Sequence, residues 1–201
     1  MPLGLWVLET ACQEAASWAL PLRVAVNMSP AQFHHPNLSQ QVGAILESSG
    51  LEPARLEIEV TEGFLIDDPH RALSILSEIK ARGVWISLDD FGTGYSSLSY
   101  LQRFPFDKIK IDRSFVQGLG RDDQADAIVR AVIAMAGSLN LTVTAEGVET
   151  EEQLSALQAQ ICDQVQGFLT GRPIPQAALS ALIGISAANV THEKAMLVAI
   201  P

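Results

Sequence analysis

The prediction of the fold starts from one stretch of sequence, Val84-Trp85-Ile86-Ser87-Leu88-Asp89-Asp90-Phe91-Gly92-Thr93-Gly94-Tyr95-Ser96-Ser97-Leu98. Its first five residues indicate a buried strand, which ends in two adjacent carboxylates, and the two glycines that follow indicate a tight loop. Neighbouring carboxylates repel each other and resist ionisation unless a cation lies between them. Divalent metals with oxygen ligands are the usual cation, and two-metal sites suit phosphoryl chemistry. The alternative is that the pair caps a turn or the following helix.

The composition predicts one globular core. The chain has 201 residues, is 48% hydrophobic and has a formal net charge of −10, and this length suffices for a single sizeable core. The acidic balance argues against a nucleic-acid polymer as partner, because no basic stripe can neutralise its phosphates. Bound metals still allow an acidic protein to hold a phosphate ligand.

Several sequence features predict a cytosolic protein. Cys12 and Cys162 lie in apolar segments without metal-ligand spacing, which indicates buried thiols. The N-terminus has no basic region of the kind that begins a signal peptide. No run approaches the roughly 20 apolar residues of a membrane span.

Short apolar runs and helical patterns alternate along the chain. Six strands are expected, at residues 22–26, 56–60, 84–88, 108–111, 141–145 and 161–165. Helices are expected at residues 5–20, 38–48, 69–82, 98–103, 123–139, 150–159 and 176–183. Gly50 and Gly83 indicate two helix ends, and Thr150 with Gln153 indicates a capping box. This alternation predicts an α/β fold with parallel strands and helical crossovers.

A doubly wound open sheet and a β/α barrel both fit this alternation. The position of the polar residues favours the barrel, because they follow six successive strand ends and converge on one point only if the strands close around it. These residues are Asn27, Glu59, Glu62, Asp89, Asp90, Lys110, Asp112, Glu146, Glu149 and Gln166. No G-x-G-x-x-G follows a strand, so a dinucleotide-binding fold has no support.

The same motifs closely resemble the EAL domain, the bacterial phosphodiesterase of cyclic di-GMP. The matching pieces span nearly the whole chain: residues 27–29, 59–62, 89–97, 110–115, 145–150, 166–168 and 172–173. The resemblance implies a TIM-like β/α barrel whose first strand is antiparallel to the others. It assigns residues 1–185 to the EAL domain and leaves residues 186–201 as a C-terminal tail.

The chain departs from the family pattern at its start. The Glu-Ala-Leu signature strand, whose Glu is a metal ligand and is followed by a substrate-binding Arg, does not occur in these residues. Six of the eight family strands are present, so the expected barrel is incomplete. The two missing strands are expected to leave open sheet edges and bare apolar residues of the interior, giving poor solubility or oligomers. Loss of the signature carboxylate is expected to leave residues 1–201 with little or no phosphodiesterase activity. A milder departure is Phe168, where the family usually has Tyr.

The resemblance also implies a role for each polar residue. The metal ligands would be Asn27, Glu59, Asp89, Asp90 and Glu146, around two Mg²⁺ or Mn²⁺ ions. Lys110 and Glu146 would be catalytic, Glu62 would anchor the loop at residues 89–97, and Asp112, Glu149 and Gln166 would line the substrate site. Ca²⁺ is expected to bind and inhibit, because its looser coordination positions the attacking water poorly.

Each role has an alternative in the residues themselves. Glu59 would be costly to bury unless it were paired or metal-bound, and a salt bridge to Lys110 satisfies this as well as a metal does. Lys110 alternates with Ile109 and Ile111, so it points into the barrel if they pack outward, where it acts on phosphoryl charge or serves as a counter-ion. Asn27 could simply form a strand-end turn. The four histidines match no motif and are expected on the surface: His34, His35, His70 and His192.

The predicted function is metal-dependent hydrolysis of cyclic di-GMP to linear pGpG in the bacterial cytoplasm. The missing signature Glu favours the alternative of a catalytically inactive EAL domain that binds cyclic di-GMP or a protein partner. A two-metal hydrolase of another phosphodiester is the third alternative, which the motif matches disfavour. A homodimer is expected, and fused or partner sensory or GGDEF domains are compatible with the sequence.

Overall fold

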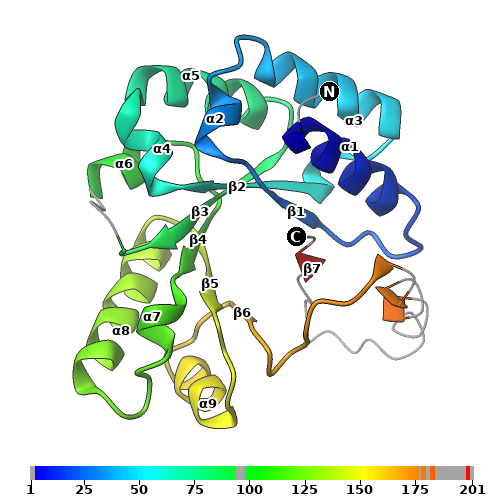
Figure 1. Cartoon of the computed structure of the whole chain (residues 1–201). Coiled ribbons are helices and arrows are strands. Elements are labelled where there is room, and N and C mark those ends of the chain that lie inside the picture. The colour runs from blue at the N-terminus through cyan, green and yellow to red at the C-terminus, as the bar shows by residue number, and fades with distance from the viewer. Residues whose placement is uncertain (1–2, 94–97, 177, 180–181, 184–197, 200–201) are drawn as a thin grey trace.

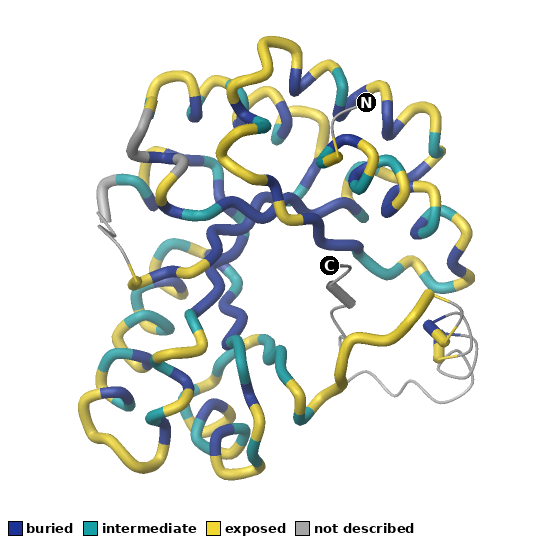
Figure 2. Tube along the Cα trace, viewed as in Figure 1, coloured by how far each residue is buried: buried dark blue, intermediate teal, exposed yellow. Residues whose placement is uncertain are grey.

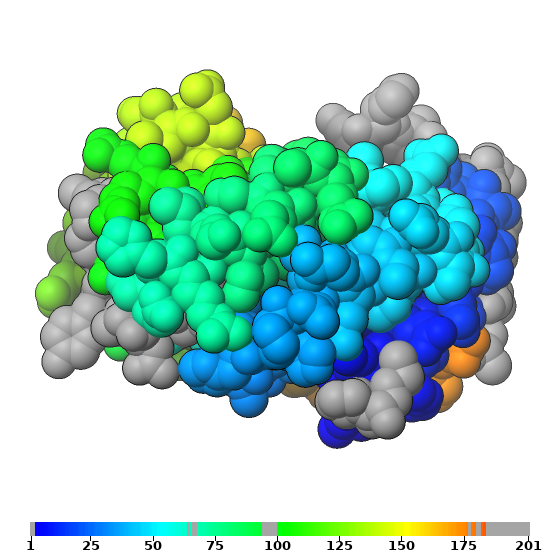
Figure 3. Space-filling view, turned by 90° about the horizontal axis from the view of Figure 1, so that it is seen from above, coloured from blue at the N-terminus to red at the C-terminus, as the bar shows by residue number. Residues whose placement is uncertain are grey.

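The chain forms one curved sheet with helices on its convex side. A computed structural model describes residues 3–93, 98–176, 178–179, 182–183 and 198–199. The strands follow an arc that stays open on one side (Figure 1). Seen from above, residues 38–60 and 69–80 form a continuous part of the surface (Figure 3).

The six strands expected from the sequence are confirmed, with small shifts of their ends. They are β1 (Val24–Asn27), β2 (Leu56–Thr61), β3 (Trp85–Phe91), β4 (Lys108–Ile111), β5 (Thr142–Glu146) and β6 (Gln164–Gln166). Neighbouring strands are parallel, in the order β6-β5-β4-β3-β2-β1. Among these six strands, those that follow one another in the sequence lie side by side in the sheet. This is the strand order of a β/α barrel, and the six strands form an incomplete barrel.

Helices connect the strands as the sequence pattern predicts. The longer ones are α1 (Leu3–Ala16), α3 (Leu38–Ser49), α5 (Pro69–Lys80), α6 (Leu98–Arg103), α8 (Asp123–Ser138) and α9 (Glu151–Ala159). Gly50 caps α3 in the left-handed conformation, and the capping box of Thr150 and Gln153 is present. Four short helical segments are additional: α2 (Pro30–Phe33), η1 (Pro53–Arg55), α4 (Glu62–Asp67) and α7 (Arg113–Val116). The helix expected at residues 176–183 lies partly outside the described residues.

The hydrophobic core lies between the sheet and the helices. Alternate strand residues point outward and are almost fully buried, among them Ile58, Ile86 and Ile109. Leu76 of α5 and Val129 of α8 are buried in the same cluster. Figure 2 shows this as a band of buried backbone along the strands, flanked by helices that are buried on one side only. Apolar burial of this kind is the main favourable term in folding.

The concave face of the sheet is polar, which corrects one expectation from the sequence. The expected apolar lining of the barrel interior is wrong. Strand alternation turns the residues between the outward-facing ones into the interior, and most of them carry polar groups: Asn27, Glu57, Glu59, Ser87, Asp89, Lys108, Lys110, Thr144, Glu146 and Gln166. An incomplete barrel therefore exposes hydrogen-bonding groups on this face, and the apolar surface stays beneath the helices.

One edge of the sheet is covered by the end of the chain. A two-residue strand, β7 (Val198–Ala199), pairs parallel with β1 through Val24 and Ala25. It lies inside the segment that sequence analysis left as a tail, and Figure 1 shows it beside β1 on the open side of the arc. Paired backbone at this edge reduces the number of N–H and C=O groups that could recruit another strand.

The cysteines and histidines lie close to where the sequence predicts. Cys12 is buried, which raises the pKa of its thiol to about 12, whereas Cys162 is only half-buried and burial raises its pKa to about 11. His34, His35 and His70 are exposed, and His192 lies outside the described residues. Within those residues, no helix is both long and apolar enough to cross a bilayer.

We predict that Ile109→Ala destabilises the fold. Ile109 lies on the central strand β4 with 0% of its side chain area exposed, and its truncation removes buried methyl groups and leaves a cavity. The free energy of unfolding should fall by about 2–5 kcal/mol, measured by urea denaturation. The matched control is Ile174→Ala, because Ile174 is 44% exposed; equal losses for the two variants would contradict the assigned core.

Candidate metal centre

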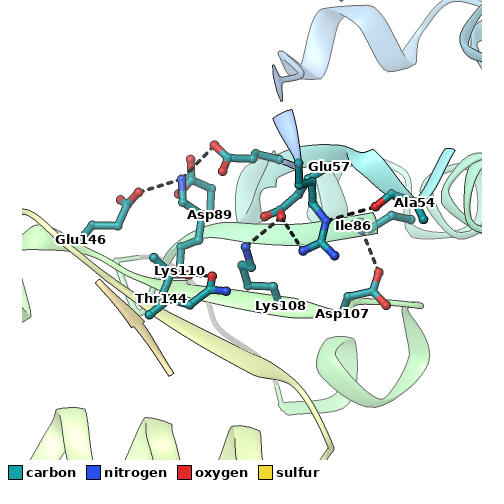
Figure 4. A network of polar contacts seen from close by, with 12 residues as sticks. Ala54, Glu57, Ile86, Asp89, Asp107, Lys108, Lys110, Thr144 and Glu146 are labelled. Atoms are coloured by element: carbon teal, nitrogen blue, oxygen red, sulfur yellow. Dashed lines mark hydrogen bonds and ion pairs between the residues drawn. The ribbon is translucent and has the colours of Figure 1, made fainter. Parts of the chain in front are cut away.

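The polar residues predicted from strand ends meet at the carboxyl edge of the sheet. Glu59, Asp89 and Lys110 lie near the ends of β2, β3 and β4, and Glu146 is the last residue of β5. Parallel pairing brings these ends to the same edge of the sheet, because all the strands run in the same direction. Figure 4 shows the side chains of Asp89, Lys110 and Glu146 pointing toward one another.

A distortion of β3 places two adjacent carboxylates on the same side. Successive residues of a regular strand face opposite sides of the sheet, yet the carboxylate oxygens of Asp89, Asp90 and Glu146 come within 4.8 Å of one another. The register between β3 and β4 shifts between Leu88 and Phe91. Asp90 has φ of 55°, the left-handed region that few non-glycine residues adopt. This bulge turns the Asp90 side chain toward the site.

Lys110 is at the centre of this group. Its Nζ lies 2.8 Å from Glu59 Oε2, 3.1 Å from Asp89 Oδ1 and 2.7 Å from Glu146 Oε1. Burial alone would lower the pKa of Lys110, but the three carboxylates outweigh it and raise the pKa above its usual value. Lys110 is therefore a cation. It forms the salt bridge to Glu59 that the sequence analysis gave as the alternative to metal binding.

Burial also shifts the carboxylates toward the neutral form. Loss of water around Glu59 raises its pKa to about 7, although Lys110 opposes the shift. Burial, together with neighbouring carboxylates, raises the pKa of Asp90 and of Glu146 above their usual values. Crowded carboxylates of this kind gain from any further cation that enters the group. Shifted pKa values at a cluster of side chains are also typical of functional sites.

Asn27 adds a neutral oxygen at the edge of the group. It ends β1, is exposed, and is in register with Glu59 on the neighbouring strand. Met28 continues the pairing by donating its N–H to the Glu59 carbonyl at 2.9 Å. The backbone thus brings Asn27 next to Glu59, as a shared ligand set requires, and its role as a ligand remains a prediction.

Glu62 contacts the loop that follows the two aspartates. Its Oε1 accepts a hydrogen bond from the Gly92 N–H at 3.0 Å, and Glu62 is buried at the start of α4. Gly92 has φ of 98°, and a Cβ there would come within 2.8 Å of Phe115. Only glycine suits both the conformation and the space. The contact expected from the sequence is thus present; residues 94–97 of the loop lie outside the described part of the chain.

The three residues expected to line a substrate site have other contacts in this structure. Asp112 caps α7 by accepting from the Ser114 N–H at 3.0 Å. Glu149 forms an exposed ion pair with Arg113 at 3.1 Å. Gln166 pairs in register with Glu146, and its buried Oε1 has no hydrogen-bond donor among the residues that the structure describes. Gln166 therefore has the strongest case of the three to face the site.

A second group of charged side chains lies two residues before the site along β2 and β4. The sequence analysis did not identify it. Lys108 Nζ lies 2.8 Å from Glu57 Oε2, with both side chains almost fully buried, and Arg23 approaches the same oxygen at 3.6 Å (Figure 4). The signal was the repeat of charge at a spacing of two, Glu57 with Glu59 and Lys108 with Lys110. A spacing of two on a strand puts both members of each pair on the same face.

Comparison with known proteins identifies a family match. A family model described as the EAL domain matches residues 1–173. An uncharacterized signaling protein of Caulobacter vibrioides is 56% identical over 178 residues, which cover 89% of this chain and 22% of that protein. MucR of Pseudomonas aeruginosa, named a bifunctional diguanylate cyclase/cyclic di-GMP phosphodiesterase, is 45% identical over 185 residues, covering 90% of this chain and 27% of its own.

Solved structures share the fold. The cyclic di-GMP complex of the PaMucR phosphodiesterase superimposes with a TM-score of 0.84 at 45% identity, covering 88% of this chain and 73% of that one. A manganese and cyclic di-GMP complex of Klebsiella pneumoniae BlrP1 gives 0.79 at 36% identity, covering 84% and 44%. The chain spans about a quarter of the length of the curated relatives it matches.

We predict that Glu62→Ala loosens the loop after β3. The change removes the acceptor of the Gly92 N–H, and a lost buried hydrogen bond costs about 1–3 kcal/mol. Amide hydrogen exchange at Phe91–Thr93 should become faster, and Mn²⁺ binding at Asp89 and Asp90 should weaken although no ligand is removed.

Glu62→Gln is the matched control, since its Oε1 can still accept from Gly92. If Glu62→Ala leaves exchange and Mn²⁺ affinity as in the unmodified chain, Glu62 does not anchor the loop.

Proposed function

The chain belongs to the EAL domain family, and on that premise we propose that it hydrolyses cyclic di-GMP to linear pGpG in a metal-dependent reaction. The observation that carries the proposal is the meeting of Asp89, Asp90 and Glu146 oxygens within 4.8 Å, beside the buried ammonium of Lys110. This combination offers cation ligands and a positive charge at one place, as phosphodiester hydrolysis needs.

The donor set suits a hard divalent cation. Asp89, Asp90, Glu146 and Glu59 offer carboxylate oxygens and Asn27 offers an amide oxygen, with neither thiol nor imidazole among them. Oxygen-only sets of this kind favour Mg²⁺ and Mn²⁺. Asp89 would contribute to ion binding together with Asp90 and Glu146, whose oxygens lie within 4.8 Å of its own. Metal ions bound there would lower the pKa of a bound water and offset charge on the phosphoryl oxygens.

The residues of the chain contribute position and charge. Lys110 would orient the attacking water or stabilise charge that develops on the phosphate, because its ammonium is fixed by the surrounding carboxylates. Glu146 would act as ligand and hydrogen-bond acceptor at the same edge. Gln166, Asp112 and Glu149 follow the neighbouring strand ends and would line the path of the dinucleotide.

A second candidate function is binding of cyclic di-GMP or a protein partner without catalysis. It is favoured by the sequence itself, since no Glu-x-Leu-x-Arg segment occurs among these 201 residues. The enzyme is favoured by the three carboxylates that meet at one place, Asp89, Asp90 and Glu146, because binding of a dinucleotide alone does not require them to converge. We further propose a bacterial cytoplasmic location and a homodimer, both from the family resemblance alone. Association with GGDEF-type or sensory domains is also proposed, and the diguanylate cyclase activity in the name of MucR supports the first of these.

We predict that the chain turns over cyclic di-GMP with Mg²⁺ or Mn²⁺ and that Asp90→Asn lowers the rate at least about 100-fold. The change removes one ligand charge at the bulge, and losses of this size are typical when a group acting on transition-state charge is removed. Chromatography of the pGpG product gives the rate. Ca²⁺ in place of Mg²⁺ should support little turnover, and chelation should abolish it.

Asp123→Asn is the matched control, because Asp123 is exposed at the start of α8 and its loss should leave the rate unchanged. Fluorescent cyclic di-GMP that binds without being cleaved would establish the binding domain instead. Absence of both binding and turnover would refute the assignment of substrate.

A further inference from the structure

The ammonium of Lys110 is surrounded by carboxylates, as a bound metal ion often is. Three carboxylates from three different strands surround it: Glu59 of β2, Asp89 of β3 and Glu146 of β5, at 2.7–3.1 Å. A lysine has three N–H donors and no acceptor, so three carboxylates match its full capacity. The side chain is 3% exposed. Lys110 therefore supplies the positive charge on which these three acids converge.

The charged layer below shows that this arrangement is particular to Lys110. Lys108 lies two residues earlier on the same strand and faces the same interior. Its ammonium has one carboxylate within salt-bridge distance, Glu57 at 2.8 Å, and Arg23 shares that carboxylate. A buried pair of one ammonium and one carboxylate fits a structural role. Three carboxylates around one ammonium instead leave the group with excess negative charge, which another cation could neutralise.

Lys110 and the candidate metal ligands share carboxylates, because Asp89 and Glu146 contact its ammonium and also belong to the group that could hold an ion. Glu59, Asp89 and Glu146 all belong to the donor set for a metal, and oxygen ligands lie about 2.0–2.6 Å from Mg²⁺ or Ca²⁺. An ion bound by both Glu59 and Asp89 would compete for the carboxylates that the ammonium now contacts. Two cations a few ångström apart in a buried site repel strongly. Asp90 lies outside the contacts of Lys110 and remains open to an ion.

We propose that Lys110 is an internal counter-cation that occupies the place between Glu59, Asp89 and Glu146, and that a divalent ion must displace its ammonium from Glu59 and Asp89 to bind there. This inference rests on the metal site of the proposed function. It makes Lys110 a competitor of the metal in the ion-free chain and leaves it beside the site, near Glu146, once the ion has entered. The salt bridge and the metal site are then two states of the same residues.

The proposal has a measurable consequence for metal affinity. A ligand that binds only when its site is vacant has an apparent affinity reduced by the vacant fraction. If Lys110 occupies the site nine times in ten or more, then removal of its charge should strengthen metal binding by at least about tenfold. A lysine that merely supports the ligands would have the opposite effect, because its removal would let the acids repel one another.

The test is a titration of Mn²⁺ into the full 201-residue chain, with the free ion followed by electron paramagnetic resonance. Lys110→Met keeps the length of the side chain and removes the charge, and it should bind Mn²⁺ about tenfold more tightly than the unmodified chain. Lys108→Met is the matched control on the same strand and should leave the affinity unchanged. Equal or weaker binding by Lys110→Met overturns the proposal, as does absence of binding in both proteins.

A second measurement covers the case in which Lys110→Met folds poorly. Buried carboxylates without their counter-ion destabilise the folded state. A metal ion that replaces the ammonium should restore this stability, because it binds the folded state. Thermal unfolding of Lys110→Met should therefore shift upward with millimolar Mn²⁺ by more than that of the unmodified chain. A variant that stays unfolded in Mn²⁺ overturns the proposal. Turnover of cyclic di-GMP is measured separately, so failure of the function is distinguishable from failure of the competition.

Discussion

The convergence of three carboxylates on the Lys110 ammonium is the interaction on which the site depends. Glu59, Asp89 and Glu146 come from three strands and lie in a largely buried place, where unpaired negative charge is very costly. Lys110 offsets this cost while the sheet holds its parallel register. The pair of Lys108 and Glu57 repeats the device one layer deeper, so the interior wall is stabilised by charge pairing while the outer wall is stabilised by apolar packing with the helices.

The bulge at Asp89 and Asp90 is the second constraint. A regular strand would direct one of these two side chains into the helical layer, where a carboxylate has no partner. The register shift and the left-handed backbone at Asp90 bring both to the interior. Gly92 then turns the chain sharply beneath Glu62 and Phe115. Local strain of this kind persists when surrounding contacts determine it, and it is frequently found at functional sites.

Family membership and physical geometry support the same site by separate routes. MucR is named as a cyclic di-GMP phosphodiesterase, and BlrP1 has been solved with manganese. The oxygen donors of this chain are of the kind that hard divalent cations prefer. Among the described residues, the concave face is mostly polar and the apolar core lies between the sheet and the helices.

Sequence alone determined the strand and helix order, because periodicity of two and of 3.6 is a local property of the chain. It also placed Glu59, Asp89, Lys110 and Glu146 at the ends of successive strands, which predicts their convergence. It could not predict the left-handed backbone of Asp90, the pairing of Lys108 with Glu57 or the pairing of β7 with β1. Those depend on register between strands, which is set by contacts among residues far apart in the chain. Only the tertiary structure decided that Lys110 pairs with three acids at once, since each acid arrives on a different strand.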